Sequence, residues 1–192
     1  MTKSNLAERG SIATLVSGSA PIHWEPALTH IANLDALQVR ASRPHAAMPR
    51  AFLRWAGSKR YLLGHLVQRL PRSYGTYFEP FLGSGSLFFL LQPSSAVLAD
   101  RCGPLIKTYE AVRDNVAAVL RCLAPLKPTK RTYYQVRSEE PQGRFKRAAN
   151  FIYLNYACWN GLYRVNASGK FNVPFGRPKT QNLTDPNNLK AC

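Results

Sequence analysis

Residues 78–100 read FEPFLGSGSLFFLLQPSSAVLAD, which is two apolar runs separated by a pair of glycines. The apolar runs at 77–81 and 96–99 predict two buried strands. Between them, Gly83-Ser84-Gly85 predicts a tight turn into a short apolar helix at 86–91. A strand, a glycine turn, a helix and a second strand indicate a parallel α/β sheet.

The acid that ends the second run indicates a nucleoside pocket. In parallel α/β sheets, glycines let a ligand approach the backbone, and a carboxylate after the next strand takes the ribose hydroxyls. Asp100 stands at that place. The dinucleotide motif G-x-G-x-x-G is absent, because Leu87 and Phe88 follow Gly85-Ser86, so we expect a nucleoside without a pyrophosphate. Taken alone, the glycines also fit an ordinary strand-to-helix turn.

The chain is strongly basic. It holds 26 Lys and Arg against 10 Asp and Glu among 192 residues, a net charge of +16. Such an excess is typical of proteins that bind an anionic polymer, because each neutralised phosphate releases counterions. A merely solubilising surface, or a ribosome-like binding role, is the alternative. Residues 1–47 hold four basic and three acidic residues, so nearly all of the excess lies in residues 48–192.

The N-terminal part differs from the rest. Residues 1–47 show no sustained period and are rich in Ala, Ser and Thr, and the patterned sequence begins directly after Met48. We therefore expect residues 1–47 to be a disordered extension, and Met48 to be the native start. Helical periodicity then predicts three longer helices, at about 60–70, 104–120 and 144–156. The segment APLKPTKR at 124–131 is predicted to be a proline-broken linker, followed by a polar stretch.

Cysteine and histidine spacing gives no metal-site pattern. The four cysteines form no C-x-x-C pair: Cys102, Cys122, Cys158 and Cys192. We interpret them as reduced thiols of a cytoplasmic protein without a metal. No apolar run approaches the length of a membrane span, and no secretory signal pattern is present, so no membrane partner is expected.

The segment NYACWNGLYRVNASGKFNVPFGR at 155–177 combines aromatic, amide and basic side chains around a predicted hairpin turn at 166–169. Trp159 and Tyr163 can stack or wedge between bases, and Asn160 can pair with a base edge. The arginines of the segment can reach guanine edges or phosphates. A packed hairpin whose arginines face water is the alternative.

Three blocks of this sequence together resemble the DNA adenine methylases of the Dam type. They are FLRWAGSKR at 52–60, FEPFLGSGS at 78–86 with Asp100, and FIYLNYACWNGLYRVNASGKFNVPFGR at 151–177, in the order found in that family. The resemblance implies an enzyme that transfers a methyl group from S-adenosyl-L-methionine to the exocyclic amine of adenine in double-stranded DNA. It also implies an α/β fold with an incomplete Rossmann-like methyltransferase sheet and an inserted helical and β-hairpin DNA-recognition region. The corresponding domains are 48–124 for the cofactor and 125–192 for DNA recognition.

The resemblance assigns residues to both ligands. Those implied to bind the cofactor are Trp55, Lys59, Phe81, Gly83, Gly85 and Asp100. Those implied to face DNA are Arg54, Trp159, Asn160, Leu162, Arg164, Pro174 and Arg177. Each role has an alternative: Trp55 as a core residue, Lys59 as a solvated charge and Asp100 as a helix N-cap. Two positions depart from the family pattern, because Ser58 replaces a glycine and Tyr156 stands where an arginine is common.

The family's D-P-P-[YF] motif, which holds the adenine amine, does not occur in this sequence. The nearest string, TDPNNLKAC at 184–192, lacks the second proline and the aromatic residue, and we reject it as catalytic. No catalytic residue is therefore assigned, and we expect this chain to be a fragment that is inactive alone. Two further hypotheses stay open: one half of a split methyltransferase whose partner chain carries the motif, and a non-catalytic DNA-binding remnant.

Overall fold

Two parallel strands and the helix between them confirm the central prediction. The computed structural model describes residues 48–192, and the predictions made for residues 1–47 lie outside the described residues. Strand β1 (Tyr77–Glu79) pairs in parallel with β2 (Ala96–Leu98). Helix α3 (Ser86–Leu91) connects them and has the predicted bounds. Both strands are shorter than predicted, and β1 is not the buried strand that was expected, because Phe78 is 66% exposed and only Glu79 of its three residues is buried. The described residues form an α/β fold with a small parallel sheet.

Long helices make up the second half of the fold. Helix α4 (Gly103–Leu123) and helix α6 (Arg144–Ala157) pack closely on each other, and both confirm predicted helices. Helix α4 is interrupted at Asn115, whose φ is −160°. The Asn115 Oδ1 atom accepts a hydrogen bond from the Ala118 amide at 2.9 Å, so this side chain caps the second part of the helix.

Helix α5 (Lys130–Ser138) is a correction, because the sequence predicted a linker and a polar stretch there. Thr129 caps the helix by accepting a hydrogen bond from the Thr132 amide. Only two of its side chains, Tyr133 and Val136, are buried. Tyr133 also donates to the Val173 carbonyl at 2.7 Å, so tertiary contacts hold a helix that has little apolar sequence of its own.

The helix predicted at 60–70 is also corrected. A 3-10 turn, η2 (Lys59–Leu62), leads into the short helix α2 (Leu63–Val67), and neither element buries a residue. Leu62, predicted on the buried face, is 54% exposed. The other residues of the predicted apolar face, Leu63, Leu66, Val67 and Leu70, are half-buried, so within the described chain the face is only partly covered.

The predicted chain reversal at 166–169 is confirmed. The Asn166 amide donates to the Lys170 carbonyl at 2.9 Å, and the Asn166 side chain accepts from the Lys170 amide. Pairing beside the turn consists of isolated bridges, Val165 with Phe171 and Cys158 with Phe175. A regular hairpin does not extend further, because Pro174 has no amide to donate to a ladder.

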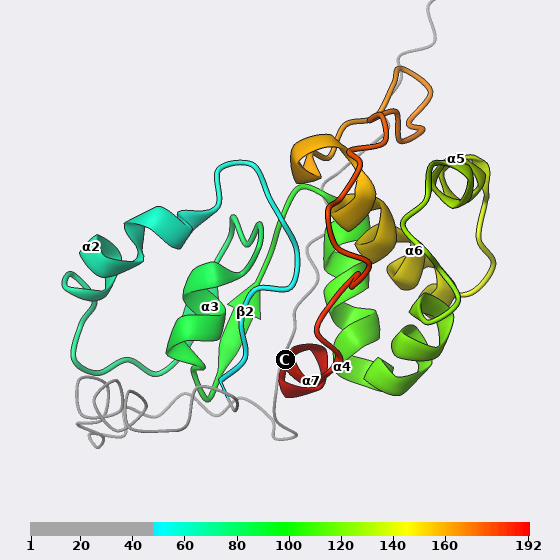
Figure 1. The fold of residues 1–192 in the computed structure, drawn as a ribbon. Helices are drawn as coiled ribbons and strands as arrows, with labels where there is room; N and C mark the ends of the chain where they lie inside the picture. The colour runs from blue at the N-terminus through cyan, green and yellow to red at the C-terminus, as the bar shows by residue number, and fades with distance from the viewer. Residues whose placement is uncertain (1–47) are drawn as a thin grey trace, which may run out of the picture.

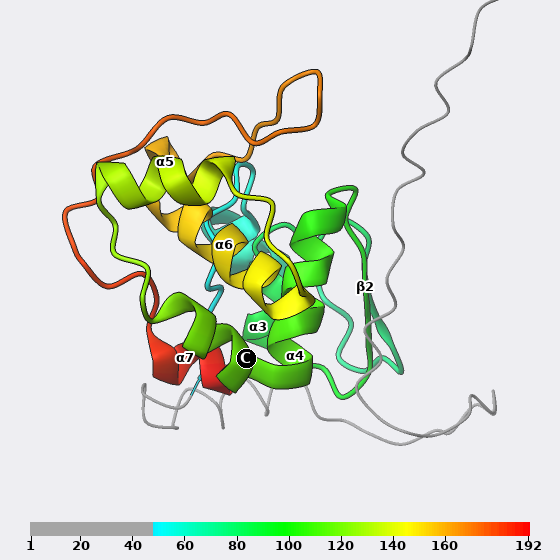
Figure 2. The same cartoon turned by 90° about the vertical axis from the view of Figure 1, so that its right-hand side faces the viewer.

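Figure 1 shows α2, α3 and β2 on one side and α4, α5, α6 and α7 (Pro186–Ala191) on the other, with residues 48–58 running between them. Figure 2 shows α5 and α6 side by side above α7. One hydrophobic core joins both sides, and its members include Leu82, Phe89, Leu98, Leu105, Ile106, Val119, Ile152 and Leu189. The 48–58 segment is therefore placed to contact both halves. Among the described residues, no helix has the length and apolar character needed to cross a membrane.

Candidate cofactor and nucleic-acid sites

Asp100 ties the end of β2 to the glycine turn after β1. Its Oδ2 atom accepts from the Gly83 amide at 2.9 Å, and its Oδ1 atom accepts from the Cys102 amide at 2.9 Å. The N-cap of α4 is Cys102, so the N-cap alternative for Asp100 is wrong. Each carboxylate oxygen has used one lone pair on the protein and keeps another for a ligand.

The glycine turn needs both of its glycines. Gly83 and Gly85 have φ values of 54° and 67°, the left-handed region. A Cβ on Gly83 would lie 3.0 Å from Trp55 Cδ1, so the turn and Trp55 pack directly against each other. The buried hydroxyl of Tyr109 donates to the Gly83 carbonyl at 3.1 Å, and burial raises its pKa well above the usual value for tyrosine. This bond therefore stays intact over the physiological pH range.

Lys59 is paired with a buried carboxylate. Its Nζ atom lies 3.0 Å from Glu79 Oε1 and also donates to the Phe81 carbonyl, so Lys59 is not merely a solvated charge. Glu79 is only 4% exposed, and its Oε2 atom accepts from the Tyr77 hydroxyl at 2.8 Å. The side chain of Phe81 is exposed, and its backbone makes the contact to Lys59. Sequence reasoning missed Glu79, although an acid inside an apolar strand was a usable signal.

Three serine hydroxyls connect the 52–60 block to the glycine turn. Ser58 Oγ lies 2.8 Å from Ser84 Oγ and 3.0 Å from Ser86 Oγ, and the latter two are 2.8 Å apart. Ser58 is one of the departures from the family pattern, and here its hydroxyl makes contacts that a glycine could not make. The structure thus brings the six predicted cofactor residues together, because the blocks at 55–59 and 81–85 meet beside Asp100.

Trp55 also packs on the predicted DNA-recognition region. Its indole ring stacks on Tyr163 with centroids 5.6 Å apart, and on Phe151 at 6.3 Å. Trp55 is half-buried against the hydrophobic core, which also fits the alternative that it is a core residue. Its cofactor role therefore stays a prediction, and its position makes it a contact between the two regions.

Trp159, Asn160 and Pro174 lie together at the end of α6. The Trp159 amide donates to the Pro174 carbonyl at 2.9 Å, while the Trp159 side chain remains 52% exposed. Asn160 has a left-handed φ of 53° inside the short 3-10 turn η3 (Trp159–Gly161), which leaves its side chain exposed. An exposed indole beside an exposed amide can stack on a base and read a base edge.

The remaining predicted DNA residues are spread along the turn region. Arg164 Nε donates to Asn172 Oδ1 at 2.7 Å across the reversal. The Leu162 carbonyl accepts from the Cys158 thiol at 3.3 Å. Arg177 is exposed with a left-handed φ of 50°, and within the described chain no hydrogen bond or ion pair joins it to the other six. Arg54 comes from the separate block at 52–60, and its guanidinium stacks over the Tyr156 ring at 5.2 Å.

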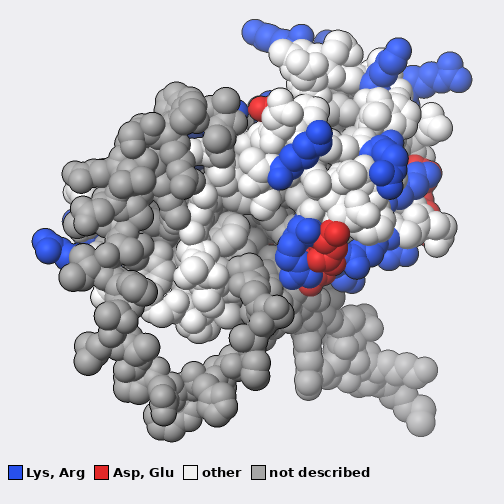
Figure 3. All heavy atoms as spheres, turned by 90° about the horizontal axis from the view of Figure 1, so that it is seen from below, with Lys and Arg blue, Asp and Glu red and all other residues white. Residues whose placement is uncertain are grey.

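The surface charge has the sign that a DNA partner requires. In Figure 3, blue Lys and Arg side chains stand out on the face seen from below, and the largest acidic cluster lies directly beside a basic one. Asp114 illustrates such pairing: its contacts with Arg113 and Arg144 lower the pKa of its carboxyl. Residues 48–192 hold 22 Lys and Arg against seven Asp and Glu, so the described residues keep a net charge of +15.

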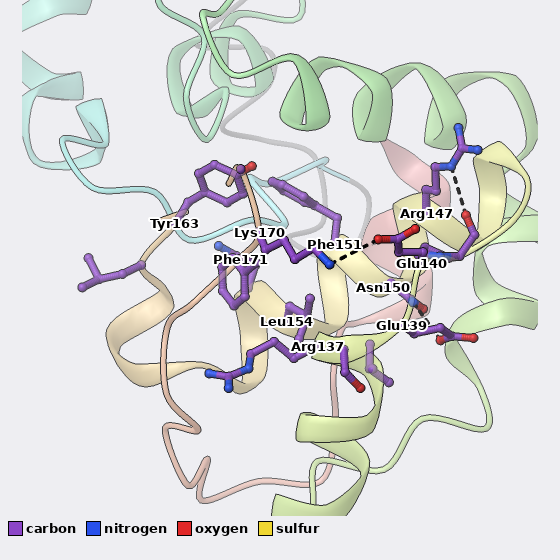
Figure 4. A pocket seen from close by; sticks show the side chains of 16 residues that line it. Arg137, Glu139, Glu140, Arg147, Asn150, Phe151, Leu154, Tyr163, Lys170 and Phe171 are labelled. Carbon is purple, nitrogen blue, oxygen red and sulfur yellow. Dashed lines mark hydrogen bonds and ion pairs between the residues drawn. The ribbon is translucent and has the colours of Figure 1, made fainter. Parts of the chain in front are cut away.

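A cavity of about 370 Å³ lies between α5, α6 and the turn region, as Figure 4 shows. Its charged groups bond within the protein: Lys170 with Glu140 at 3.5 Å, and Arg147 Nε with the Pro141 carbonyl at 3.1 Å. None of the six predicted cofactor residues lines it, and Leu162 is its one predicted DNA residue. The cofactor site therefore does not depend on this cavity.

Cys158, next to the exposed indole of Trp159, is expected to resist alkylation. Its thiol is buried, and burial raises its pKa to about 11, so the thiolate is scarce at pH 7.5. We expect iodoacetamide to label the partly exposed Cys122 in the native protein and Cys158 only after unfolding in urea, as read by peptide mass spectrometry. Equal labelling rates for Cys158 and Cys122 in the native protein would contradict this placement of Cys158.

Comparison with known proteins relates most of this chain to one family. The family model for "D12 class N6 adenine-specific DNA methyltransferase" matches residues 55–192. The chain is 39% identical over 144 residues to the type II methyltransferase M1.LlaDCHI of Lactococcus lactis subsp. cremoris, covering 71% of this chain and 51% of that protein. It is 42% identical over 136 residues to the DNA adenine methylase of Escherichia coli, covering 68% and 49% respectively. The chain spans about half the length of the curated relatives it matches.

Proposed function

Because the chain belongs to the D12 class of N6 adenine-specific DNA methyltransferases, we propose that residues 48–192 bind S-adenosyl-L-methionine and duplex DNA for methylation of the adenine amine. The observation that carries the proposal is the carboxylate of Asp100, held by two backbone amides at the carboxyl ends of parallel strands. In such sheets this edge is where nucleoside ligands bind.

The residues present fit the cofactor. Asp100 offers two free lone pairs to the vicinal hydroxyls of a ribose, and the missing Cβ of Gly83 lets the Trp55 ring pack directly on the turn beside that carboxylate. Lys59 supplies a cation for the carboxylate end of the methionine moiety, and Glu79 holds that cation in place. S-adenosyl-L-methionine, when bound, supplies a methyl group on a sulfonium. The protein then has to position this group, since proximity and orientation dominate such transfers.

The DNA-recognition region is proposed to be residues 125–192, inserted beside a Rossmann-like sheet of which β1 and β2 form part. An enzyme that acts on a base must take it out of the stack. Trp159 has the exposed aromatic face for wedging, and Asn160 has the exposed amide. Arg164 and Arg177 supply cations for phosphates or guanine edges. A DNA substrate is consistent with the cytoplasmic location expected from the sequence.

The carboxylate that holds the adenine amine is proposed to come from a polypeptide segment other than these 192 residues, on the same or another chain. The nearest match, Asp185-Pro186, has a structural role, because Asp185 Oδ1 accepts from the Asn187 and Asn188 amides and caps α7. Leu189 of that helix is fully buried against the core, so the cap holds a helix that is part of the fold.

Trp159→Ala is expected to weaken duplex binding about tenfold, because one base–aromatic stack contributes about 1–3 kcal/mol. Affinity for S-adenosyl-L-methionine should stay unchanged. Fluorescence anisotropy of a labelled duplex at fixed salt measures the effect. Tyr61→Ala is the matched control, since Tyr61 is a highly exposed aromatic outside the recognition region. Equal losses in the two variants would show that Trp159 makes no specific contact.

Methyl transfer tests the whole proposal. The 192-residue chain is incubated with labelled S-adenosyl-L-methionine and unmethylated duplex DNA, with and without a second polypeptide that carries a D-P-P-[YF] segment from a relative. We expect N6-methyladenine only in the complemented reaction. Transfer by the 192-residue chain alone would show that another residue holds the amine. Cofactor-independent DNA binding without transfer in either reaction would favour a DNA-binding remnant.

A further inference from the structure

One buried amide, that of Asn155, holds the backbone of a residue 101 positions earlier in the chain. The Oδ1 atom of Asn155 accepts from the Arg54 amide at 2.8 Å, and its Nδ2 atom donates to the Arg54 carbonyl at 2.8 Å. The same Nδ2 donates to the Gly161 carbonyl at 3.2 Å. Asn155 is 5% exposed, so these three bonds are made away from water. One side chain thus fixes both the 52–60 block and the turn at the end of α6.

Gly161 completes this contact from the other side. A Cβ added to Gly161 would lie 2.5 Å from the Arg54 Cβ, and Gly161 has a φ of +63°. The absence of a side chain at position 161 therefore lets the turn that carries Trp159 and Asn160 sit directly on Arg54. The turn at 159–161 is therefore in direct contact with Arg54, and a shift of one requires a shift of the other.

Arg54 and Trp55 link this contact to the two proposed ligands. Arg54, which is proposed to face DNA, is exposed and has its guanidinium over the Tyr156 ring. The next residue, Trp55, packs against Gly83 of the glycine turn that we propose approaches the cofactor. Two neighbouring residues thus contact different sites, and Asn155 holds the backbone of the first one.

We infer that Asn155 is a positioning residue that couples cofactor binding to DNA binding. The inference rests on the proposed function. A ligand that orders Trp55 also orders Arg54 and, through Asn155, the turn at 159–161. The second ligand then meets a segment that is already ordered, so the two bind with positive cooperativity, equal in both directions.

The coupling is measured as the ratio of duplex dissociation constants without and with saturating S-adenosylhomocysteine, by anisotropy at fixed salt. For the unaltered chain we expect a ratio of about 10, within the usual range of such couplings. For Asn155→Ala we expect a ratio within about twofold of 1. The substitution removes the hydrogen bonds to Arg54 and Gly161 that link the two sites, and it leaves the residues that contact the ligands in place. A merely structural role would lower both affinities and leave the ratio unchanged.

Asn150→Ala is the matched control. Asn150 lies on the same helix, is also 5% exposed, and bonds to Glu139 instead of to Arg54, so its variant should keep the ratio. Should Asn155→Ala fail to fold in a thermal melt, Gly161→Ala disturbs the same contact from the other side, and the ratio is measured there. The inference is overturned if Asn155→Ala or Gly161→Ala folds and keeps the ratio of the unaltered chain. It is also overturned if the unaltered chain binds both ligands with a ratio of 1. An unaltered chain that binds neither ligand overturns the proposed function as well.

Discussion

Asp100→Asn is expected to lower the affinity for S-adenosyl-L-methionine about 100-fold, which corresponds to about 3 kcal/mol. The substitution replaces one acceptor oxygen with an amide group that can only donate. The Gly83 and Cys102 amides then compete with the ribose for the single remaining oxygen. Hydrogen bonds to a charged acceptor contribute about 1.5–3 kcal/mol each, and at least one is lost along with the charge. Isothermal titration calorimetry of the folded variant measures the loss.

Asp114→Asn is the matched control for this prediction. Asp114 is an acid on α4 that pairs with Arg113 and Arg144 on the surface and makes no bond to the glycine turn. Its variant should bind the cofactor as the unaltered chain does. Asp100→Asn should also leave duplex binding in the absence of cofactor within a few-fold. Unchanged cofactor affinity in Asp100→Asn would remove the ribose role from Asp100.

Gly176→Ala is expected to destabilise the chain by about 3 kcal/mol, because the new methyl group would meet backbone that cannot move aside. A Cβ there would lie 2.3 Å from the Cys158 carbonyl oxygen and 2.8 Å from the Trp159 nitrogen. The Gly176 amide donates to the Ala157 carbonyl at 2.8 Å in the same place, so relief of the clash breaks this bond. A calorimetric scan should show the melting temperature lowered by about 10 °C.

Duplex binding should fall in the same variant, because the segment that moves carries the Pro174 carbonyl, which accepts from the Trp159 amide. Gly75→Ala is the control, since a Cβ at that exposed position would meet nothing within 4 Å and no positive φ is involved. We expect its melting temperature to stay within about 2 °C. A Gly176→Ala protein that melts like Gly75→Ala would mean that residues 157–176 pair differently.

The parts of the fold that could be predicted are those that local sequence determines. Two short apolar runs, a glycine pair and one acid were enough to place β1, α3, β2 and Asp100, because each element depends on its own residues. The long apolar periods of α4 and α6 were equally direct. Asp100, the residue predicted to bind a ribose, lies beside the glycine turn because the parallel pairing of β1 and β2 brings the ends of the two strands together.

What could not be predicted depends on contacts between distant segments. Helix α5 is held by Tyr133 reaching the Val173 carbonyl, a partner 40 residues away. Glu79 stands out as an acid inside an apolar strand, but its cation, Lys59, comes from a separate block, so the sequence did not show that the two pair. Asn155 had no predicted role for the same reason, since it acts on the backbone of Arg54. Composition and hydrophobic periodicity report on residues that are close in the sequence, whereas these three residues make their contacts with segments that are distant in the sequence.

Residues 48–192 are proposed above all to form a site for an adenosine-bearing cofactor around Asp100. An equilibrium titration of the 192-residue chain with radiolabelled S-adenosyl-L-methionine tests this site, in a sample shown to be folded by a cooperative thermal melt. We predict saturable binding at one site per chain, displaced by S-adenosylhomocysteine and lost in Asp100→Asn but not in Asp114→Asn. A folded chain with no saturable binding, or binding that Asp100→Asn leaves unchanged, would rule the site out.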